Sequence, residues 1–518
     1  MRRPPARRLG GGPVPGLGDA VEASVEGLPA AISLAPGSVV PALGGEIVLA
    51  PTEPSTAGGA RDVTSDTVRE GLLQAGPLAV AGLVANGASA VVTILLARLL
   101  TTRGYGSLAQ LTGLFLVVSM PGSALIVGVV RRVAAWQGAV SADRVRRWAA
   151  RLYVRGMAAV AALAVVVVVA RDWIDARLSS PDAFGVVAML VAGAVWVLLS
   201  LDRGLLQAHR AYRSLAVNLL VEGGVRVAAM LCLVGAGGGV AGAAGGVLLA
   251  EVVTAVHARL AADRAWAAES DTGPGPGAAS VAGGPTGAHT PASVADGPGS
   301  VGGAGADRPP LPAGSRRAAA LDLATALPAM AMIALLQNVD VIVLARDAPH
   351  GSGAYAAISV ASKAMIFGAL VLGGYLLPEA AIRWHEGGHA LRQLLVTLVL
   401  LAVPAGLLLA AAVGAPSTLL SLVFSARYTG ASHAFAPLVL AMVFLSITVT
   451  LTMYLLAIGS RWIGGVLLAG SVAAVAAVAV AHGAPVATAR NDLLVQAGLA
   501  VAVTAGFALA HRERLSRR

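Results

Sequence analysis

Long apolar runs alternate with short polar or basic segments along most of this chain. A helix needs about 20 consecutive apolar residues to cross the hydrocarbon core of a membrane. This pattern predicts twelve transmembrane helices, near residues 75–99, 106–130, 150–170, 184–204, 214–236, 240–261, 319–345, 355–378, 392–413, 433–457, 463–482 and 491–510. The run over 161–170 does not alternate between apolar and polar positions, which argues against a transmembrane barrel. The expected fold class is therefore an all-α polytopic membrane protein.

Two segments interrupt the pattern of apolar runs. Residues 1–68 contain no continuous apolar region, so we expect a disordered cytoplasmic tail and no cleaved signal peptide. Residues 263–317 are rich in Gly, Pro, Ala and Ser, which predicts a flexible cytoplasmic linker. These segments leave an N-terminal six-helix lobe over 69–262 and a C-terminal six-helix lobe over 318–511, followed by a basic tail over 512–518. Because each lobe crosses the membrane an even number of times, the lobes would be parallel repeats.

Composition and charge agree with a membrane protein and indicate its orientation. Hydrophobic residues make up 57% of the chain and charged residues 12%, which is too apolar for a soluble globular protein. One set of loops and both tails hold 28 of the lysines and arginines, whereas the opposite loops hold 7. Basic residues favour the cytoplasmic side, so both termini should be cytoplasmic in a multi-pass protein of the cell membrane. This bias explains the net charge of +10, which therefore requires no nucleic-acid partner.

The first hairpins of the two lobes share a short internal match. The string LAR at 96–98 precedes GYG at 104–106 much as LAR at 344–346 precedes GAY at 353–355. Both strings lie between the first two helices of a lobe. The match supports an internal repeat, although short Gly/Tyr turns are common at membrane interfaces.

Several longer strings resemble a known family. ARLLTTRGYGSLAQLTG, NVDVIVLAR followed by GAYAAISVASK, and LVFSARYTGASHAFAPLVLAM are similar to the polysaccharide-transporter branch of the MATE-like multidrug/oligosaccharidyl-lipid/polysaccharide superfamily, which includes O-antigen flippases. The resemblance covers roughly residues 70–510. It implies two six-helix lobes around a central cavity that flip a lipid-linked saccharide of the polyprenyl diphosphate type to the outer leaflet. It implies no catalytic residues and no cofactor, and the long tail and linker depart from the family's compact pattern.

Ionisable residues inside the apolar runs are candidate binding residues, because charges within a membrane usually meet a partner or a wet cavity. Arg226 and Glu251 lie at similar distances from the turn near 237–239, so both should be near mid-membrane on neighbouring helices. Glu222 lies one turn from Arg226 and can join them. The three groups would carry an excess negative charge. They are either structural ion pairs or a site for an anionic headgroup or a coupling ion.

A second group of polar residues lies in the C-terminal lobe. Asp340 and Lys363 should differ in depth by only about 4–5 Å, so their side chains can meet. Asn338 and Gln337 offer further hydrogen bonds, which explains why the carboxylate is tolerated there. A structural ion pair and a site for an anionic diphosphate or a coupling proton or cation both remain open. Arg98 is another candidate, though a side chain that extends to the membrane surface explains it better.

Three other functions deserve weighing. The string HEGGH at 385–389 fits the H-E-x-x-H zinc-hydrolase signature. Its Gly-Gly pair weakens the required helix, it falls in an expected cytoplasmic loop, and it has no evident third ligand. A major-facilitator transporter shares the six-linker-six plan, but the loop RRVAAWQGAVSADRVRR lacks that group's G-x-x-x-D-R-x-G-R-R pattern. A drug or small-molecule secondary transporter, of the MATE or the major-facilitator type, is the alternative to a flippase, and no metal site or enzymatic activity is expected.

Overall fold

The computed structural model describes residues 63–136, 142–178, 182–271, 313–366, 369, 391–457, 460 and 462–516. All regular elements among these residues are helices, and they contain no strand. The first half contains α2 (Val63–Leu99), α3 (Thr102–Ser119), α4 (Pro121–Trp136), α5 (Ala142–Val169), α6 (Arg171–Leu178), α7 (Ala183–Ala208), α8 (Tyr212–Leu233), the π-helix η1 (Val234–Gly238) and α9 (Gly239–Asp271). The second half contains α10 (Ala313–Asp347), a helix over 352–366, α12 (Leu391–Gly414), α13 (Pro416–Val423), the 3-10 helix η3 (Ala426–Ala434), α14 (Phe435–Ala457), α15 (Trp462–Ala479) and α16 (Pro485–Ser516).

Ten stretches of the described chain are long and apolar enough to cross a membrane. One of them, Tyr212–Ala267, contains both helices expected over 214–236 and 240–261. The span expected over 355–378 is described only in part. The expectation of an all-α membrane protein is therefore confirmed, and a total of twelve helices agrees with these stretches.

Several helices differ from their expected bounds. The run expected as one helix over 106–130 is divided at Met120, because Pro121 lacks the N–H that would continue the hydrogen-bond ladder. Helix α2 begins at Val63, inside the expected tail over 1–68. Helices α9 and α10 extend into the expected linker over 263–317 from its two ends. The rest of the linker, 272–312, lies outside the described residues, as does most of the tail.

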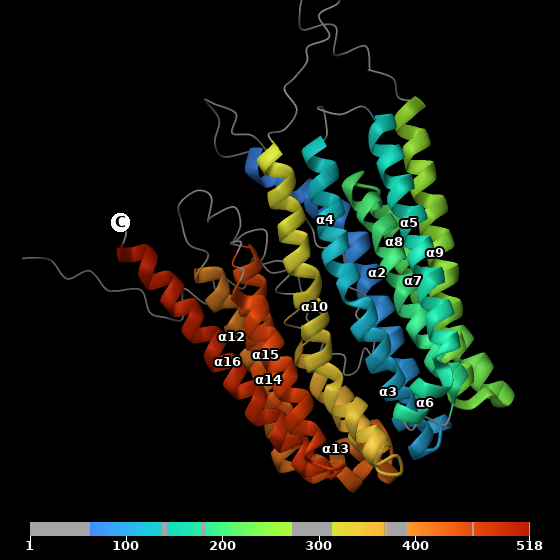
Figure 1. Cartoon of the computed structure of the whole chain (residues 1–518), viewed down its shortest axis with the longest axis vertical. Coiled ribbons are helices and arrows are strands. Elements are labelled where there is room, and N and C mark those ends of the chain that lie inside the picture. Colours follow the sequence, from blue (N-terminus) through green and yellow to red (C-terminus); the bar gives the residue numbers. More distant parts are fainter. Residues whose placement is uncertain are drawn as a thin grey trace, which may run out of the picture. The chain divides into compact units, whose positions relative to one another are not determined.

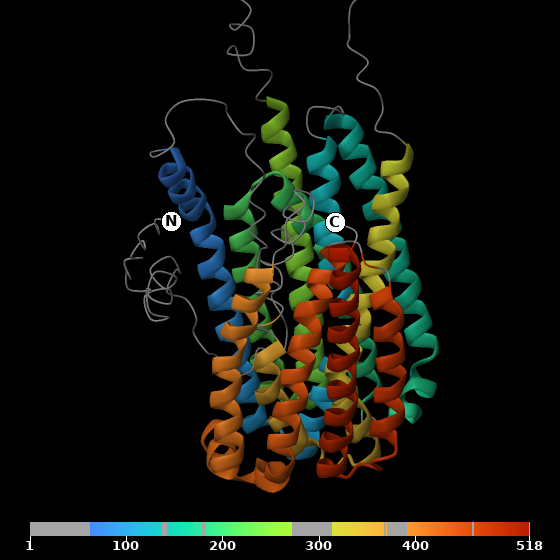
Figure 2. The same ribbon diagram turned by 90° about the vertical axis from the view of Figure 1, so that its left-hand side faces the viewer.

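Each half is held together by long helix contacts. In the first half α7 packs against α3, α4, α5 and α9, and α8 packs against α2 and α9. In the second half α14 packs against α12 and α16, and α15 packs against α10 and α16. Figures 1 and 2 show these groups of helices side by side from two directions.

Helix α10 also joins the two halves, because it packs against α3 and α4 of the first half. The largest cluster of buried apolar side chains accordingly draws on both halves, with Phe115 from α3 and Ile333 from α10 among its members. Gln110 of α3 spans the same boundary, where its Nε2 donates to the carbonyl oxygen of Ile342 at 3.0 Å. The two halves are thus in direct contact.

The two strings of the internal match meet at one end of this boundary. We call this place the α2–α3 end, because α2 ends and α3 begins there. A Cβ atom added to Gly353 would collide with the backbone of Thr102, and one added to Gly106 would collide with Ser352 and Gly353. Only glycine permits so close an approach of two backbones. The arginine distribution predicts that this end faces outward.

Candidate functional site

Five polar side chains from three helices form a continuous network in the first half, which we call the N-half network. Its members are Arg203 of α7, Asn218, Glu222 and Arg226 of α8, and Glu251 of α9. Arg203 donates from Nη2 to Glu222 Oε2 at 2.5 Å and from Nε to Asn218 Oδ1 at 2.8 Å. Arg226 donates from Nη2 to Glu222 Oε1 at 2.5 Å and also to Glu251. All five side chains are buried.

The predicted contact among Glu222, Arg226 and Glu251 is confirmed. These three residues alone carry one excess negative charge, and Arg203, which the sequence-based prediction did not include, supplies a second buried positive charge that leaves two of each sign. Arg203 lies in the expected fourth span but near its end, so it resembled one of the basic residues that collect at the cytoplasmic surface. Asn218 extends the network by donating to the carbonyl oxygen of Thr254 at 3.0 Å.

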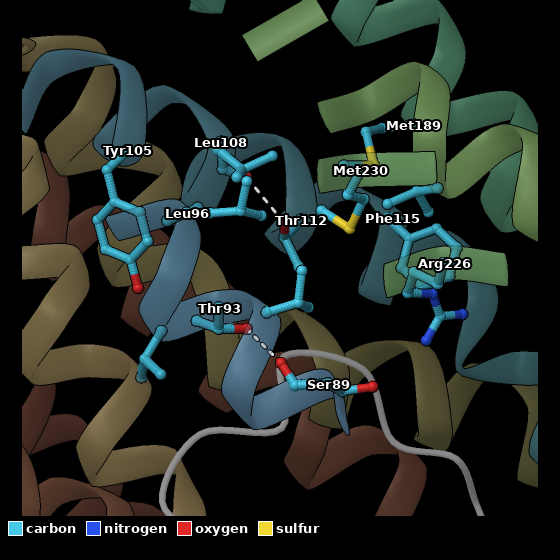
Figure 3. A pocket seen from close by; sticks show the side chains of 14 residues that line it. Ser89, Thr93, Leu96, Tyr105, Leu108, Thr112, Phe115, Met189, Arg226 and Met230 are labelled. Carbon is cyan, nitrogen blue, oxygen red and sulfur yellow. Dashed lines mark hydrogen bonds between the residues drawn. The ribbon is translucent and has the colours of Figure 1, made fainter. Parts of the chain in front are cut away.

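Arg226 also lines a pocket beside this network. Thirteen further residues line the pocket: Ser89, Val92, Thr93, Leu96, Tyr105, Leu108, Ala109, Thr112, Phe115, Met189, Met230, Val247 and Val360. Figure 3 shows Tyr105 and Arg226 at opposite ends of a lining formed mainly by apolar side chains. Val360 comes from the second half, so the pocket lies at the boundary of the two halves. Its volume of about 40 Å³ admits only a small group in this conformation.

Few polar atoms face this pocket without a partner. The hydroxyls of Ser89, Thr93 and Thr112 donate to backbone carbonyl oxygens one turn earlier, two of these bonds being drawn in Figure 3. Arg226 Nε and the Tyr105 hydroxyl have no hydrogen-bond partner among the described residues. Arg226 is the charged residue of the described lining. The pocket thus combines apolar walls with one guanidinium group.

The second half contains its own buried polar group, which we call the C-half cluster. It consists of Asn338 and Asp340 of α10, Lys363 of the helix over 352–366, and Asp492 and Gln496 of α16. Lys363 Nζ donates to Asn338 Oδ1 at 3.0 Å. Gln496 Nε2 donates to Asp492 Oδ1 at 3.1 Å and to the carbonyl oxygen of Leu336 at 3.2 Å. All five side chains are buried.

The predicted direct pairing of Asp340 with Lys363 is not observed among the described contacts. Lys363 is hydrogen-bonded to Asn338 instead, and Asp340 Oδ2 accepts a long hydrogen bond of 3.5 Å from Ser359. Asp340, Lys363 and Asp492 still lie close enough for their charges to interact. Asp492 escaped the sequence interpretation, because it lies near the start of the last expected span, where a carboxylate can reach water.

The C-half cluster has an unsatisfied hydrogen-bonding atom and an unbalanced negative charge. Asp492 Oδ2 is buried without a hydrogen-bond partner among the described residues, whereas the Tyr355 hydroxyl lies beside the carboxylate of Asp340. Two carboxylates share the single charge of Lys363, so the described members carry one excess negative charge when all are ionised. A buried charge without a partner is costly. A bound proton or metal cation would balance the cluster.

The other candidate residues do not join these groups. The side chain of Arg98 is exposed at the α2–α3 end, and only its carbonyl oxygen takes part in a described hydrogen bond. The HEGGH string at 385–389 lies outside the described residues. Within the residues described, no group of three or more His, Cys, Asp and Glu side chains could hold a metal ion.

The chain is similar to known proteins in fold but not in sequence. No family model and no curated protein matches the chain. Among solved structures, a MOP superfamily transporter from Pyrococcus furiosus, described by a binding pocket of reverse polarity that suggests a different function, is 14% identical with a TM-score of 0.53, covering 86% of this chain and 93% of that one. A multidrug resistance MATE family transporter in an inward-facing conformation is 13% identical with a TM-score of 0.54, covering 81% and 95%.

A third solved structure, a variant of the Vibrio cholerae MATE transporter VcmN, is 16% identical with a TM-score of 0.51, covering 87% of this chain and 98% of the other. These coverages span both halves of the chain. The chain therefore has the fold of MOP superfamily transporters.

Proposed function

We propose that this protein is a membrane transporter that flips an anionic lipid-linked oligosaccharide or polysaccharide precursor to the outer leaflet by alternating access. The observation that carries the proposal is the position of Arg226 in an apolar pocket bordered by both halves. A pocket at such a boundary changes shape when the halves move. The fold of MOP transporters supports movement of this kind.

The lining of the pocket favours an amphiphile with a negative charge. Apolar walls suit an isoprenoid or acyl chain, whereas a guanidinium binds phosphate oxygens through charge-assisted hydrogen bonds. A polyprenyl diphosphate carrier has both features. The cavity of about 40 Å³ is far too small for a saccharide, so the sugar would enter only after the halves separate.

Glu251 provides a means to release Arg226 for such a headgroup. Arg226 is bonded to both Glu222 and Glu251, but Glu222 has a second cation in Arg203. Glu251 forms no other ion pair among the described residues, although the charge of Arg203 is near enough to act on it, and its Oε2 has no hydrogen-bond partner there. A proton on Glu251 would weaken its bond to Arg226 and leave the guanidinium for the incoming phosphate. Substrate and proton would then bind together.

The C-half cluster is the place we propose for a coupling ion. Its two carboxylates share Lys363, which balances only one of them, and Asp492 Oδ2 has no hydrogen-bond partner among the described residues. A proton or a monovalent cation would supply the missing charge. Occupancy of this cluster could therefore control whether the second half moves relative to the first.

A drug transporter of the MATE type is the second candidate, and the solved structures of that fold favour it. One of the structures named above is that of a multidrug resistance MATE family transporter. A cationic drug would need a carboxylate in the pocket lining, however, and the charged lining residue described here is an arginine. The sign of the transported charge therefore separates the two candidates.

Flipping in reconstituted vesicles tests the proposal. A fluorescent polyprenyl-diphosphate oligosaccharide placed in both leaflets would be bleached by an impermeant reductant only in the outer leaflet, unless the protein flips it. We expect the parent protein to flip it and Arg226→Gln to be at least about tenfold slower, since a hydrogen bond to a charged group contributes about 1.5–3 kcal/mol. Arg213→Gln, an exposed change on the same helix, is the matched control.

A second variant separates binding from folding. Ala109→Phe narrows the pocket and replaces no residue of the N-half network, so it should slow flipping while leaving the thermal unfolding midpoint near that of the parent. Flipping that is unchanged in both variants would exclude this pocket from the substrate path. Uptake of a cationic dye together with no movement of the lipid would establish the drug transporter instead.

A further inference from the structure

The C-terminus of α2 is capped by two side chains from the other half of the chain. Arg427 of η3 donates from Nη2 to the carbonyl oxygen of Arg98 at 2.9 Å and also to that of Ala97. The hydroxyl of Tyr428 donates to the same Ala97 oxygen. We call this set of contacts the Arg427–Tyr428 cap. It joins residues about 330 positions apart in the sequence.

The cap provides hydrogen-bond donors for backbone carbonyl groups that have no partner at the end of α2. The last four carbonyl groups of an α-helix have no partner within the helix, and they carry the negative end of its dipole. A helix commonly solves this with a glycine in the left-handed conformation just beyond its end. Leu100 and Thr101 follow α2 instead, and neither has a positive φ. The cationic Arg427 takes over this role from the second half.

Aromatic contacts surround the cap. The ring of Tyr105, at the start of α3, lies 5.5 Å from that of Tyr428 and 6.3 Å from that of Phe424. The guanidinium of Arg427 lies 5.2 Å from the ring centre of Tyr428. Tyr105, Phe424 and Tyr428 are all buried. The contact between the halves therefore combines hydrogen bonds with a small apolar seal.

This contact differs from the charged contacts within each half in one respect. The arginines of the N-half network are buried, and separating them from carboxylates that stay ionised would leave unpaired charges in an apolar interior. Arg427 is exposed, so water can replace the carbonyl oxygens when the contact opens. The acceptors are backbone oxygens, which also accept hydrogen bonds from water. The cap can thus open and close at modest cost without any change of protonation, whereas the N-half network cannot.

We propose that the Arg427–Tyr428 cap is a releasable latch that holds the two halves together at the α2–α3 end. This inference rests on the proposed function, because alternating access requires the halves to separate at the end predicted to face outward. The latch would close behind a released substrate and open again once the next one is bound. Residues of this latch would then set how often the protein opens outward.

Thiol labelling measures the latch without any transport. Ser352 is buried at the α2–α3 end beside Gly106, so a cysteine there should react slowly with an impermeant maleimide while the halves are closed. The Ser352→Cys change is made in a Cys232→Ser background, since Cys232 is an exposed free thiol. Adding Arg427→Ala should raise the labelling rate by about tenfold, the effect of losing a charge-assisted hydrogen bond.

Three further variants keep the test decisive. Tyr428→Phe should raise labelling less, because the ring contacts remain, and Arg427→Lys should fall between the parent and Arg427→Ala. Arg103→Ala, which removes a nearby exposed arginine outside the cap, should leave the rate unchanged. If Arg427→Ala fails to fold, the Lys and Phe variants carry the comparison. A labelling rate in the folded variants equal to that of the parent would overturn the latch.

The outcomes also distinguish the latch from the proposed function. Faster labelling in Arg427→Ala together with a parent protein that flips no lipid would reject the function and retain the latch. Lipid flipping by the parent together with unchanged labelling would reject the latch and retain the function.

Discussion

Arg203 is the residue whose loss should most destabilise the first half. It is buried on α7 and supplies the second positive charge of the N-half network. Arg203→Leu leaves Arg226 to balance two carboxylates, so one buried negative charge is uncompensated. Breaking a buried ion pair from one side typically costs about 3–5 kcal/mol. We expect a clearly lower thermal unfolding midpoint in detergent.

Two comparisons make this prediction specific. Arg213→Leu removes an exposed arginine from the neighbouring helix and should leave the midpoint nearly unchanged. Arg203→Leu combined with Glu222→Gln removes one charge of each sign and should recover much of the loss. An Arg203→Leu protein as stable as the Arg213→Leu control would contradict the charge balance described here.

Replacing Asp492 should impair transport without lowering stability, unlike the loss of Arg203. It is buried, and it shares Lys363 with Asp340. Asp492→Asn removes the excess charge and can keep the hydrogen bond to Gln496, so the unfolding midpoint should stay equal or rise. If the C-half cluster binds the coupling ion, lipid flipping should lose its dependence on a proton or sodium gradient. Asp347→Asn, an exposed change at the end of α10, is the control.

Loss of stability in Asp492→Asn, or flipping that still follows the ion gradient, would contradict this role. The related double change of Asp340→Asn with Lys363→Gln adds a second test. If these residues serve only as structural charges, the neutral double variant should flip lipid normally. If either binds substrate or ion, the double variant should fold and fail to transport.

Residue spacing predicted some of these contacts and could not predict others. Glu222, Arg226 and Glu251 were recognisable because one helical turn and one short hairpin determine their relative depth. The partner of Lys363 was not, because Asn338 and Asp340 have similar depths but point about 200° apart around their helix. Depth alone cannot tell which of them faces the lysine. Asp492 needed the packing of α16 against α10, which no local pattern contains.

At the scale of elements, apolar pattern predicted where helices lie better than where they end. Alanine is the best helix former, so an Ala-rich segment can continue a helix after its apolar run stops. Residues 258–268 have this composition, and α9 continues to Asp271, where the sequence TGPGPG follows. The expected linker therefore contained the end of a helix. Proline shortens helices instead: the apolar run expected as one helix over 106–130 is divided at Met120 and Pro121.

These helix ends change which part of the linker should be dispensable. Shortening within 272–312 should preserve membrane insertion and lipid flipping, because loop-closure entropy changes only slowly with length. Trp266 should not be removable, since it is buried against His209 with ring centres 4.3 Å apart. We expect Trp266→Ala to cost about 3–5 kcal/mol, seen as a lower unfolding midpoint. A shortened protein that inserts normally but no longer flips lipid would show that the linker binds something.

At the scale of the whole chain, the contacts within and between the halves differ in kind. Buried charged networks link helices inside each half, where they resist separation. Between the halves the described contacts at the α2–α3 end are two close glycines, an aromatic cluster and an exposed arginine. Opening at this end would separate few buried charges, which suits the proposed alternating access. The pocket at Arg226 and Val360 would open along this boundary.

The close approach of backbones at Gly353 offers the sharpest test of this boundary. An alanine Cβ at Gly353 would collide with the backbone of Thr102, which cannot move aside as a flexible side chain could. Gly353→Ala should therefore hold the halves apart at the α2–α3 end while each half stays folded. Gly430→Ala is the matched control at the same end, because a Cβ there meets no atom within 4 Å.

Spin labels on opposite halves would report this separation. Arg103 of α3 and Ser421 of α13 are exposed, so both can carry a label after replacement by cysteine in a Cys232→Ser background. We expect Gly353→Ala to shift the measured distances to longer values and Gly430→Ala to leave them unchanged. Because a steric wedge acts without changing any charge, the shift would also be independent of salt. Equal label-to-label distances in the two variants would mean that the halves do not separate at the Gly353 contact.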